Sequence, residues 1–197
     1  NFILMSSWGL IHVFAGGVAR LDTQISQGAL DLAMTTPRSP LMVLALTSSD
    51  LPAWGDILLG GLGLSYLAFQ WGPVFFLHGL LMIMLSTLAL FSVFLSIGCL
   101  AFWLRRTDAA ASVLLNMCLA YNTYPLLSET AGVRWSIFIM PILLLGIIPA
   151  SYFTKPSLQT LAIEFFGSIV VFTIARTLFY FGLRRYQSAS VPGFQRT

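Results

Sequence analysis

The sequence has few charged residues. Ten Lys or Arg and seven Asp or Glu residues occur among 197, which is 9% of the chain. A soluble domain carries about a quarter charged residues, so a polar surface cannot be built from this set. Because 57% of the residues are hydrophobic, the composition excludes an ordinary soluble domain and predicts an integral, all-helical membrane protein.

The residues of common catalytic sites are also scarce. Lys155 is the only lysine and a proline follows it, so the sequence lacks the GxxxxGK[ST] loop that holds ATP phosphates. His12 and His78 stand alone in different apolar segments, and no metal site or cofactor is predicted in this chain. Cys99 and Cys118 lie in apolar runs and are interpreted as small buried residues. We therefore expect no enzymatic activity in this chain.

Long apolar runs supply the predicted membrane spans. A hydrocarbon core about 30 Å thick needs about 20 apolar residues of helix. The run 57–104 contains no charge and would be roughly 70 Å long as a single helix, so Gln70-Trp71-Gly72-Pro73 is expected to divide it. Five spans are predicted, at about residues 1–19, 51–69, 74–104, 109–128 and 158–183.

The segment 135–154 is also apolar, but Pro141 and Pro149 interrupt it. A full crossing would place Arg184 and Arg185 outside, whereas a re-entrant external hairpin would return them to the cytoplasm. The re-entrant reading puts seven arginines inside, namely Arg20, Arg38, Arg105, Arg106, Arg184, Arg185 and Arg196. It is preferred for that reason. It also implies a sixth span upstream of Asn1, in an N-terminally truncated permease domain covering 1–197.

Two charges fall within the last apolar run. Glu164 and Arg176 are twelve residues apart, about 18 Å along a helix, so they cannot pair within it. Charges inside a membrane are costly and are candidates for function. Glu164 and Arg176, with Pro141 and Pro149, are therefore candidates for gating or for the substrate path. The alternative is that both charges are interface anchors.

A cytoplasmic loop is predicted at 20–50. Leu21, Ile25, Ala29 and Leu32 fall on one face of a helix, and Thr35-Thr36-Pro37 is expected to end that helix. A membrane protein without a nucleotide site can still be driven by ATP if a cytoplasmic helix of this kind docks into a separate ATPase subunit. Many interfacial helices share this pattern, so the pattern alone leaves the role open.

Several short motifs in a fixed order indicate which family of membrane proteins the chain resembles. The loop contains Ile25, Gly28-Ala29-Leu30-Asp31 and Pro37-Arg38-Ser39-Pro40-Leu41. Later matches are Gly55-Asp56-Ile57-Leu58-Leu59-Gly60, Tyr124-Pro125-Leu126, Ile139-Met140-Pro141, Ile148-Pro149-Ala150 and Gly182-Leu183-Arg184-Arg185-Tyr186. Together they resemble the permease subunits of type-2 ABC transporters, in particular a bacterial family of mostly unassigned substrate. Ala29 departs from the pattern, which usually has Glu.

The resemblance implies a six-span permease of the bacterial cytoplasmic membrane. The apolar and aromatic lining does not identify the substrate. The resemblance also implies an exporter built from two permease subunits, identical or related, on two ATP-binding cassette subunits that carry ATP and magnesium. Its coupling helix would comprise Gln27, Gly28, Ala29, Leu30, Asp31, Leu32 and Met34, and the hairpin at 134–154 would be an outer gate. Lipid is the remaining expected partner, and no nucleic acid is expected. The alternatives are a membrane scaffold subunit without transport activity and a secondary carrier.

Overall fold

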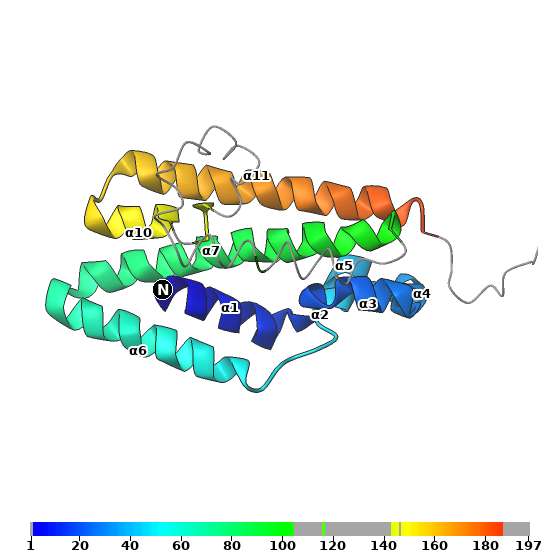
Figure 1. The fold of residues 1–197 in the computed structure, drawn as a ribbon, viewed down its shortest axis with the longest axis horizontal. Helices are drawn as coiled ribbons and strands as arrows, with labels where there is room; N and C mark the ends of the chain where they lie inside the picture. The colour runs from blue at the N-terminus through cyan, green and yellow to red at the C-terminus, as the bar shows by residue number, and fades with distance from the viewer. Residues whose placement is uncertain (1, 105–115, 117–142, 146, 187–197) are drawn as a thin grey trace, which may run out of the picture.

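Four long helices lie side by side along the long axis of the molecule (Figure 1). The computed structural model describes residues 2–104, 116, 143–145 and 147–186, and every regular element within them is a helix. The long helices are α1 (Phe2–Phe14), α6 (Ala53–Trp71), α7 (Pro73–Cys99) and α11 (Leu158–Leu183). Helix α7 is central, with α11 on one side and α1 and α6 on the other. The predicted all-helical class is confirmed for these residues.

Two of the helices are long and apolar enough to cross a membrane. They are Pro73–Phe102, in which the short 3₁₀ helix η1 (Leu100–Phe102) continues α7, and Leu158–Leu183. Helix α6 has the length of a span, but Asp56 and Gln70 lower its hydropathy. The predicted span at 109–128 lies outside the described residues, apart from Asn116. The number of five spans therefore stays a prediction.

The first predicted span is not one continuous helix. Helix α1 ends at Phe14, Ala15 has a non-helical φ of −141°, and the four-residue α2 (Gly16–Ala19) follows. Two successive glycines are poor helix formers. Gly17 also packs directly against the carbonyl oxygen of Leu44, where a larger residue would not fit. The predicted span at 1–19 therefore contains a break after Phe14.

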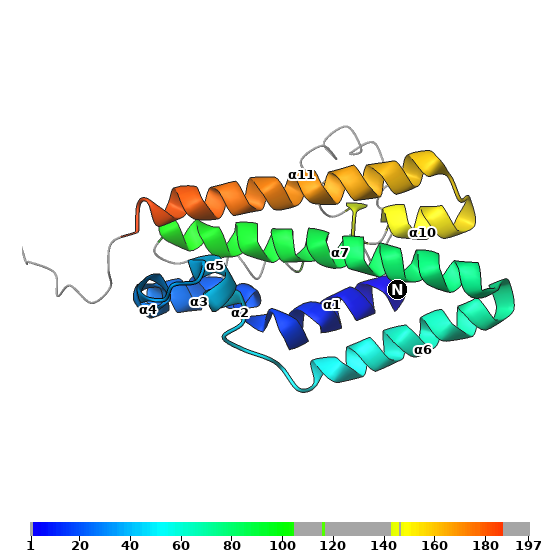
Figure 2. The ribbon, with the colours of Figure 1, turned by 180° about the vertical axis from the view of Figure 1, so that it is seen from behind.

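The two ends of the bundle differ. The α6–α7 turn contains Gly72 at φ 98°, at the predicted break. The turn from α10 (Ile147–Thr154) to α11 lies at the same end (Figures 1 and 2). The opposite end holds the short helices after residue 20 and the C-terminal ends of α7 and α11. Arg184 and Arg185 thus share an end with Arg20 and Arg38, as the predicted orientation requires.

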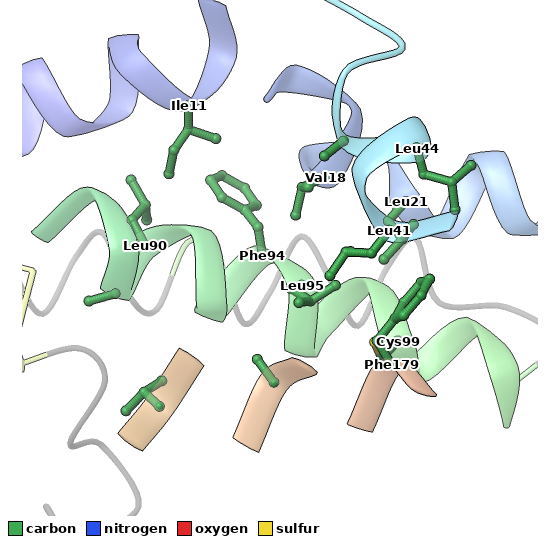
Figure 3. Close-up of a cluster of buried hydrophobic side chains, with 14 of the residues drawn as sticks. Ile11, Val18, Leu21, Leu41, Leu44, Leu90, Phe94, Leu95, Cys99 and Phe179 are labelled. Atoms are coloured by element: carbon green, nitrogen blue, oxygen red, sulfur yellow. The ribbon is translucent and has the colours of Figure 1, made fainter. Parts of the chain in front are cut away.

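A single apolar cluster joins the short helices to the bundle. Figure 3 shows Leu21, Leu41 and Leu44 close to Leu95 of α7 and Phe179 of α11. Each of these side chains is at most 9% exposed. The short helices are therefore part of the core and not a separate appendage.

Candidate coupling site

Three short helices form a cap on one end of the bundle: α3 (Leu21–Ser26), α4 (Ala29–Thr35) and α5 (Pro40–Ala45). Gly28 separates α3 from α4 with a left-handed backbone at φ 78°, which only glycine adopts without strain. Helix α4 ends at Thr35, as predicted, because Thr36 becomes extended before a proline. Ser39 then caps α5, accepting a hydrogen bond from the Met42 N–H at 3.4 Å.

The turn at Gly28 changes which residues are buried. One continuous helix would bury Ala29 and Leu32, but Leu32 is 73% exposed and Ala29 is half-buried. Leu30 and Ala33 take their place at 0% and 1% exposure. The predicted apolar face is therefore correct for α3 and wrong for α4. The left-handed residue rotates the second helix relative to the first, and the simple helical period does not continue through it.

Helix α3 is anchored on the end of α7. A Cβ atom on Gly98 would lie 2.7 Å from the Leu21 Cβ, so the absence of a side chain at residue 98 lets the two helices meet. Leu21 is fully buried there. Helix α4 in turn packs against α5 and α3. A displacement of α4 is thereby connected through α3 to α7, and α7 packs along α11.

Polar contacts close the capping segment at both ends. Arg20 Nη2 and Asp50 Oδ1 form an ion pair at 2.6 Å. The Gln24 side-chain amide donates to the Gly17 carbonyl at 3.1 Å and to Thr47 Oγ1 at 2.7 Å. These contacts tie α3 to the residues before it and to the end of α5. The segment 20–50 is held as one unit.

The outer surface of the cap carries exposed apolar side chains on α4. Leu32 and Met34 are 73% and 46% exposed on α4, and Gln27 is exposed beside them. Next to α4 lies an open hollow of about 380 Å³. Its lining residues are Thr36, Pro37, Arg38, Met42, Val43 and Leu46. Exposed leucine and methionine side chains next to a hollow are typical of an interaction surface.

The predicted coupling residues thus divide into two groups. Gln27, Leu32 and Met34 face outward, and Asp31 is half-buried in the first turn of α4. Leu30 faces the core and positions the helix. Gly28 sets the angle between α3 and α4.

The gating candidates lie elsewhere and are not brought together. Glu164 is 0% exposed between α11 and α7, beside Ser86. Arg176 is exposed, with its guanidinium 5.7 Å from the centre of the Tyr180 ring. Pro149 is buried in α10, and Pro141 lies outside the described residues. Arg176 also lines a hollow of about 370 Å³ between α11 and α5.

Several residues of these sites carried no signal in the sequence. The Arg20–Asp50 pair spans thirty positions, and no local pattern predicts such a contact. Ser86, the neighbour of Glu164, stands in a long apolar run where a serine has no distinctive context. Only the unusual carboxyl within an apolar helix pointed to that region.

These features define a helical membrane protein whose cap of short helices is packed onto its long helices. The comparison with protein families then gives the particular class. The chain belongs to the ABC-2 transporter family, because the family model described as "ABC-2 family transporter protein" matches residues 2–190. It is therefore a membrane component of an ABC transporter, as the sequence motifs predicted. The chain matches no curated protein and no solved structure.

Proposed function

We propose that this chain is the membrane-spanning subunit of an ATP-driven exporter in the bacterial cytoplasmic membrane. Two such subunits, identical or related, form the pathway and are powered by two separate ATP-binding subunits. Family membership supports the transport role. The 197 residues contain no phosphate-binding loop, which is consistent with ATP hydrolysis by a separate subunit.

The observation that carries the proposal is the exposed apolar surface of α4. Leu32 and Met34 project from a helix whose other face is fixed by Leu30 and Ala33 in the core. Burial of a leucine side chain in a partner stabilises a complex by roughly 1.5–3 kcal/mol. A firmly anchored helix with two exposed apolar side chains therefore suits docking into a groove of an ATP-binding subunit.

The packing of the cap would transmit a movement of α4 to the long helices. Closure of the ATP-binding subunits would push α4, and α4 rests on α5 and α3. Helix α3 rests on α7 through Leu21 and Gly98. Because α7 is the central helix, its movement would shift α11 and change access to the pathway.

The other end of the molecule would then contain the outer gate. Helix α10 with Pro149 lies beside the start of α11 at the end opposite to the cap. The proposed re-entrant hairpin at 134–154 would open and close the pathway there. Arg176, next to the hollow between α11 and α5, is the proposed contact for substrate inside the membrane.

Co-purification tests the assignment. The full chain, tagged and extracted in mild detergent, should bring down a subunit that contains the GxxxxGK[ST] loop. Leu32→Ser should reduce the amount recovered by about 10-fold or more, the equivalent of one lost leucine contact. Leu51→Ser is the matched control, because Leu51 is 79% exposed and lies outside α4, directly after the segment 20–50.

Equal recovery with both variants would show that α4 is not the docking helix. Recovery of other membrane proteins without any ATP-binding subunit would point to a scaffold. Transport driven by an ion gradient in the absence of ATP would point to a secondary carrier.

A further inference from the structure

A buried polar cluster of Ser86, the Leu144 carbonyl and Glu164 lies away from the cap, where α7, α11 and the segment 143–145 meet. The Ser86 hydroxyl on α7 lies 3.2 Å from the Leu144 carbonyl oxygen and 3.5 Å from Glu164 Oε1. Ser86, Leu144 and Glu164 are all 0% exposed. Leu144 stands three residues before α10, and it fits against α11 because Gly167 has no side chain in its way.

The number of available protons limits the hydrogen bonds that Ser86, Leu144 and Glu164 can form. A serine hydroxyl has one proton and can donate it to one acceptor at a time. The shorter distance assigns that proton to the Leu144 carbonyl. The contact with Glu164 is then a hydrogen bond only if the carboxyl group carries a proton and donates it to Ser86 Oγ.

The second carboxyl oxygen supports the same protonation state. Among the residues that the structure describes, Glu164 Oε2 has no hydrogen-bond partner, and neither does the buried Ser168 hydroxyl one helical turn further on. A carboxylate with one wholly unpaired oxygen is very costly in an apolar interior, and a neutral carboxyl group is much less so. The site therefore accommodates a protonated Glu164 better than an ionised one.

We propose that Glu164 is a proton-binding site that controls how the segment 143–145 is attached to α7. When Glu164 is protonated, Ser86 donates to Leu144 and holds that segment. When Glu164 loses its proton to the solution, the Ser86 hydroxyl donates its hydrogen bond to the carboxylate in place of the Leu144 carbonyl, which is released. The proposal concerns the permease chain alone and does not depend on the docking role of α4.

Other ionisable groups on the elements packed against Glu164 are few. Among the described residues they are His78 and Cys99 on α7, Tyr152 on α10, Lys155 in the α10–α11 turn, and Arg176 and Tyr180 on α11. None forms an ion pair with Glu164 in this part of the chain. His78 is the strongest rival, because its ring lies 5.6 Å from the Tyr152 ring across the α7–α10 contact.

Distance measurement between two spin labels tests the proposal without the ATP-binding partner. The labels are attached at Ser151→Cys on α10 and Met84→Cys on α7, both exposed, in the full chain in lipid nanodiscs with Cys99 and Cys118 replaced by alanine. Between about pH 5 and about pH 10, we expect the ratio of released to held α10 to rise about fivefold or more in the parent chain.

The variants distinguish the role of each group. Glu164→Gln keeps the size and a donor, so α10 should stay held at every pH. Ser86→Ala should leave α10 released at every pH. His78→Gln should retain the full response of the parent chain.

Three results would overturn the proposal. One is a distance distribution that does not change with pH in the parent chain. Another is a pH response that survives in Glu164→Gln or disappears in His78→Gln. The third is a response to sodium at fixed pH, which would mean that the oxygen atoms bind a metal cation in place of a proton.

Discussion

Arg20 and Asp50, thirty positions apart, close the capping segment with a 2.6 Å ion pair between Nη2 and Oδ1. Arg20 directly precedes α3, and Asp50 follows α5. The Asp50 backbone N–H also donates to the His12 carbonyl at 2.9 Å, which ties this end of the segment to α1. The pair therefore marks the boundary between the long helices and the cap that carries α4.

Loss of this pair should loosen the cap without unfolding the protein. Arg20 is exposed, and such pairs contribute about 1 kcal/mol at most. Asp50→Asn should raise the rate of tryptic cleavage after the exposed Arg38 by about two- to fivefold, because the segment opens more often. Gel analysis of timed digests of the purified chain measures this rate.

Asp22→Asn is the control for the loss of charge. The Asp22 carboxylate accepts from the Thr23 N–H at 2.8 Å, an interaction that asparagine can keep, and it forms no ion pair among the described residues. Equal acceleration by both variants would mean that charge, and not the Arg20–Asp50 contact, governs opening of the segment.

The angle between α3 and α4 should depend on Gly28. Alanine is strained at φ 78°, so Gly28→Ala should destabilise the cap by about 1 kcal/mol and weaken partner binding. Asparagine tolerates the left-handed region better, so Gly28→Asn should lie between glycine and alanine. Thermal unfolding of the chain in nanodiscs gives the order. If alanine is at least as stable as asparagine, the left-handed turn is not required.

Leu30 and Leu32 are neighbours in sequence with opposite roles. Leu30 is fully buried, so Leu30→Ala should cost about 2–5 kcal/mol of stability. Leu32 is 73% exposed, so Leu32→Ala should change stability by less than about 0.5 kcal/mol while it weakens partner binding. Denaturation of the isolated chain, followed by partner recovery, separates the two effects. A large loss of stability in Leu32→Ala would place that side chain in the core.

The sequence predicted the elements with strong local signals. The breaks at Gly72-Pro73 and before Pro37 were correct because glycine and proline restrict the backbone directly. The 26 residues of α11 were predicted from the apolar run between Pro156 and Arg184. The family was predicted from motifs that are individually short but follow one another in order.

Other features depend on contacts between distant residues. The rotation of α4 depends on the left-handed backbone of Gly28. The apolar pattern alone does not predict that conformation, because a glycine can also continue a helix. The break after Phe14 depends on packing of Gly17 against α5. Ser86, the partner of Glu164, lies 78 positions away on α7, and the Leu144 carbonyl that Ser86 also contacts lies twenty positions before Glu164. Apolar periodicity contains no information about either contact.

Photo-crosslinking from α4 tests the proposed docking most directly. A photoreactive amino acid at Leu32 or Met34 should form an adduct with the ATP-binding subunit in the assembled transporter. The same group at Phe69, which is 90% exposed near the α6–α7 turn, should form none. Adducts from Phe69 but not from Leu32 or Met34 would contradict the account.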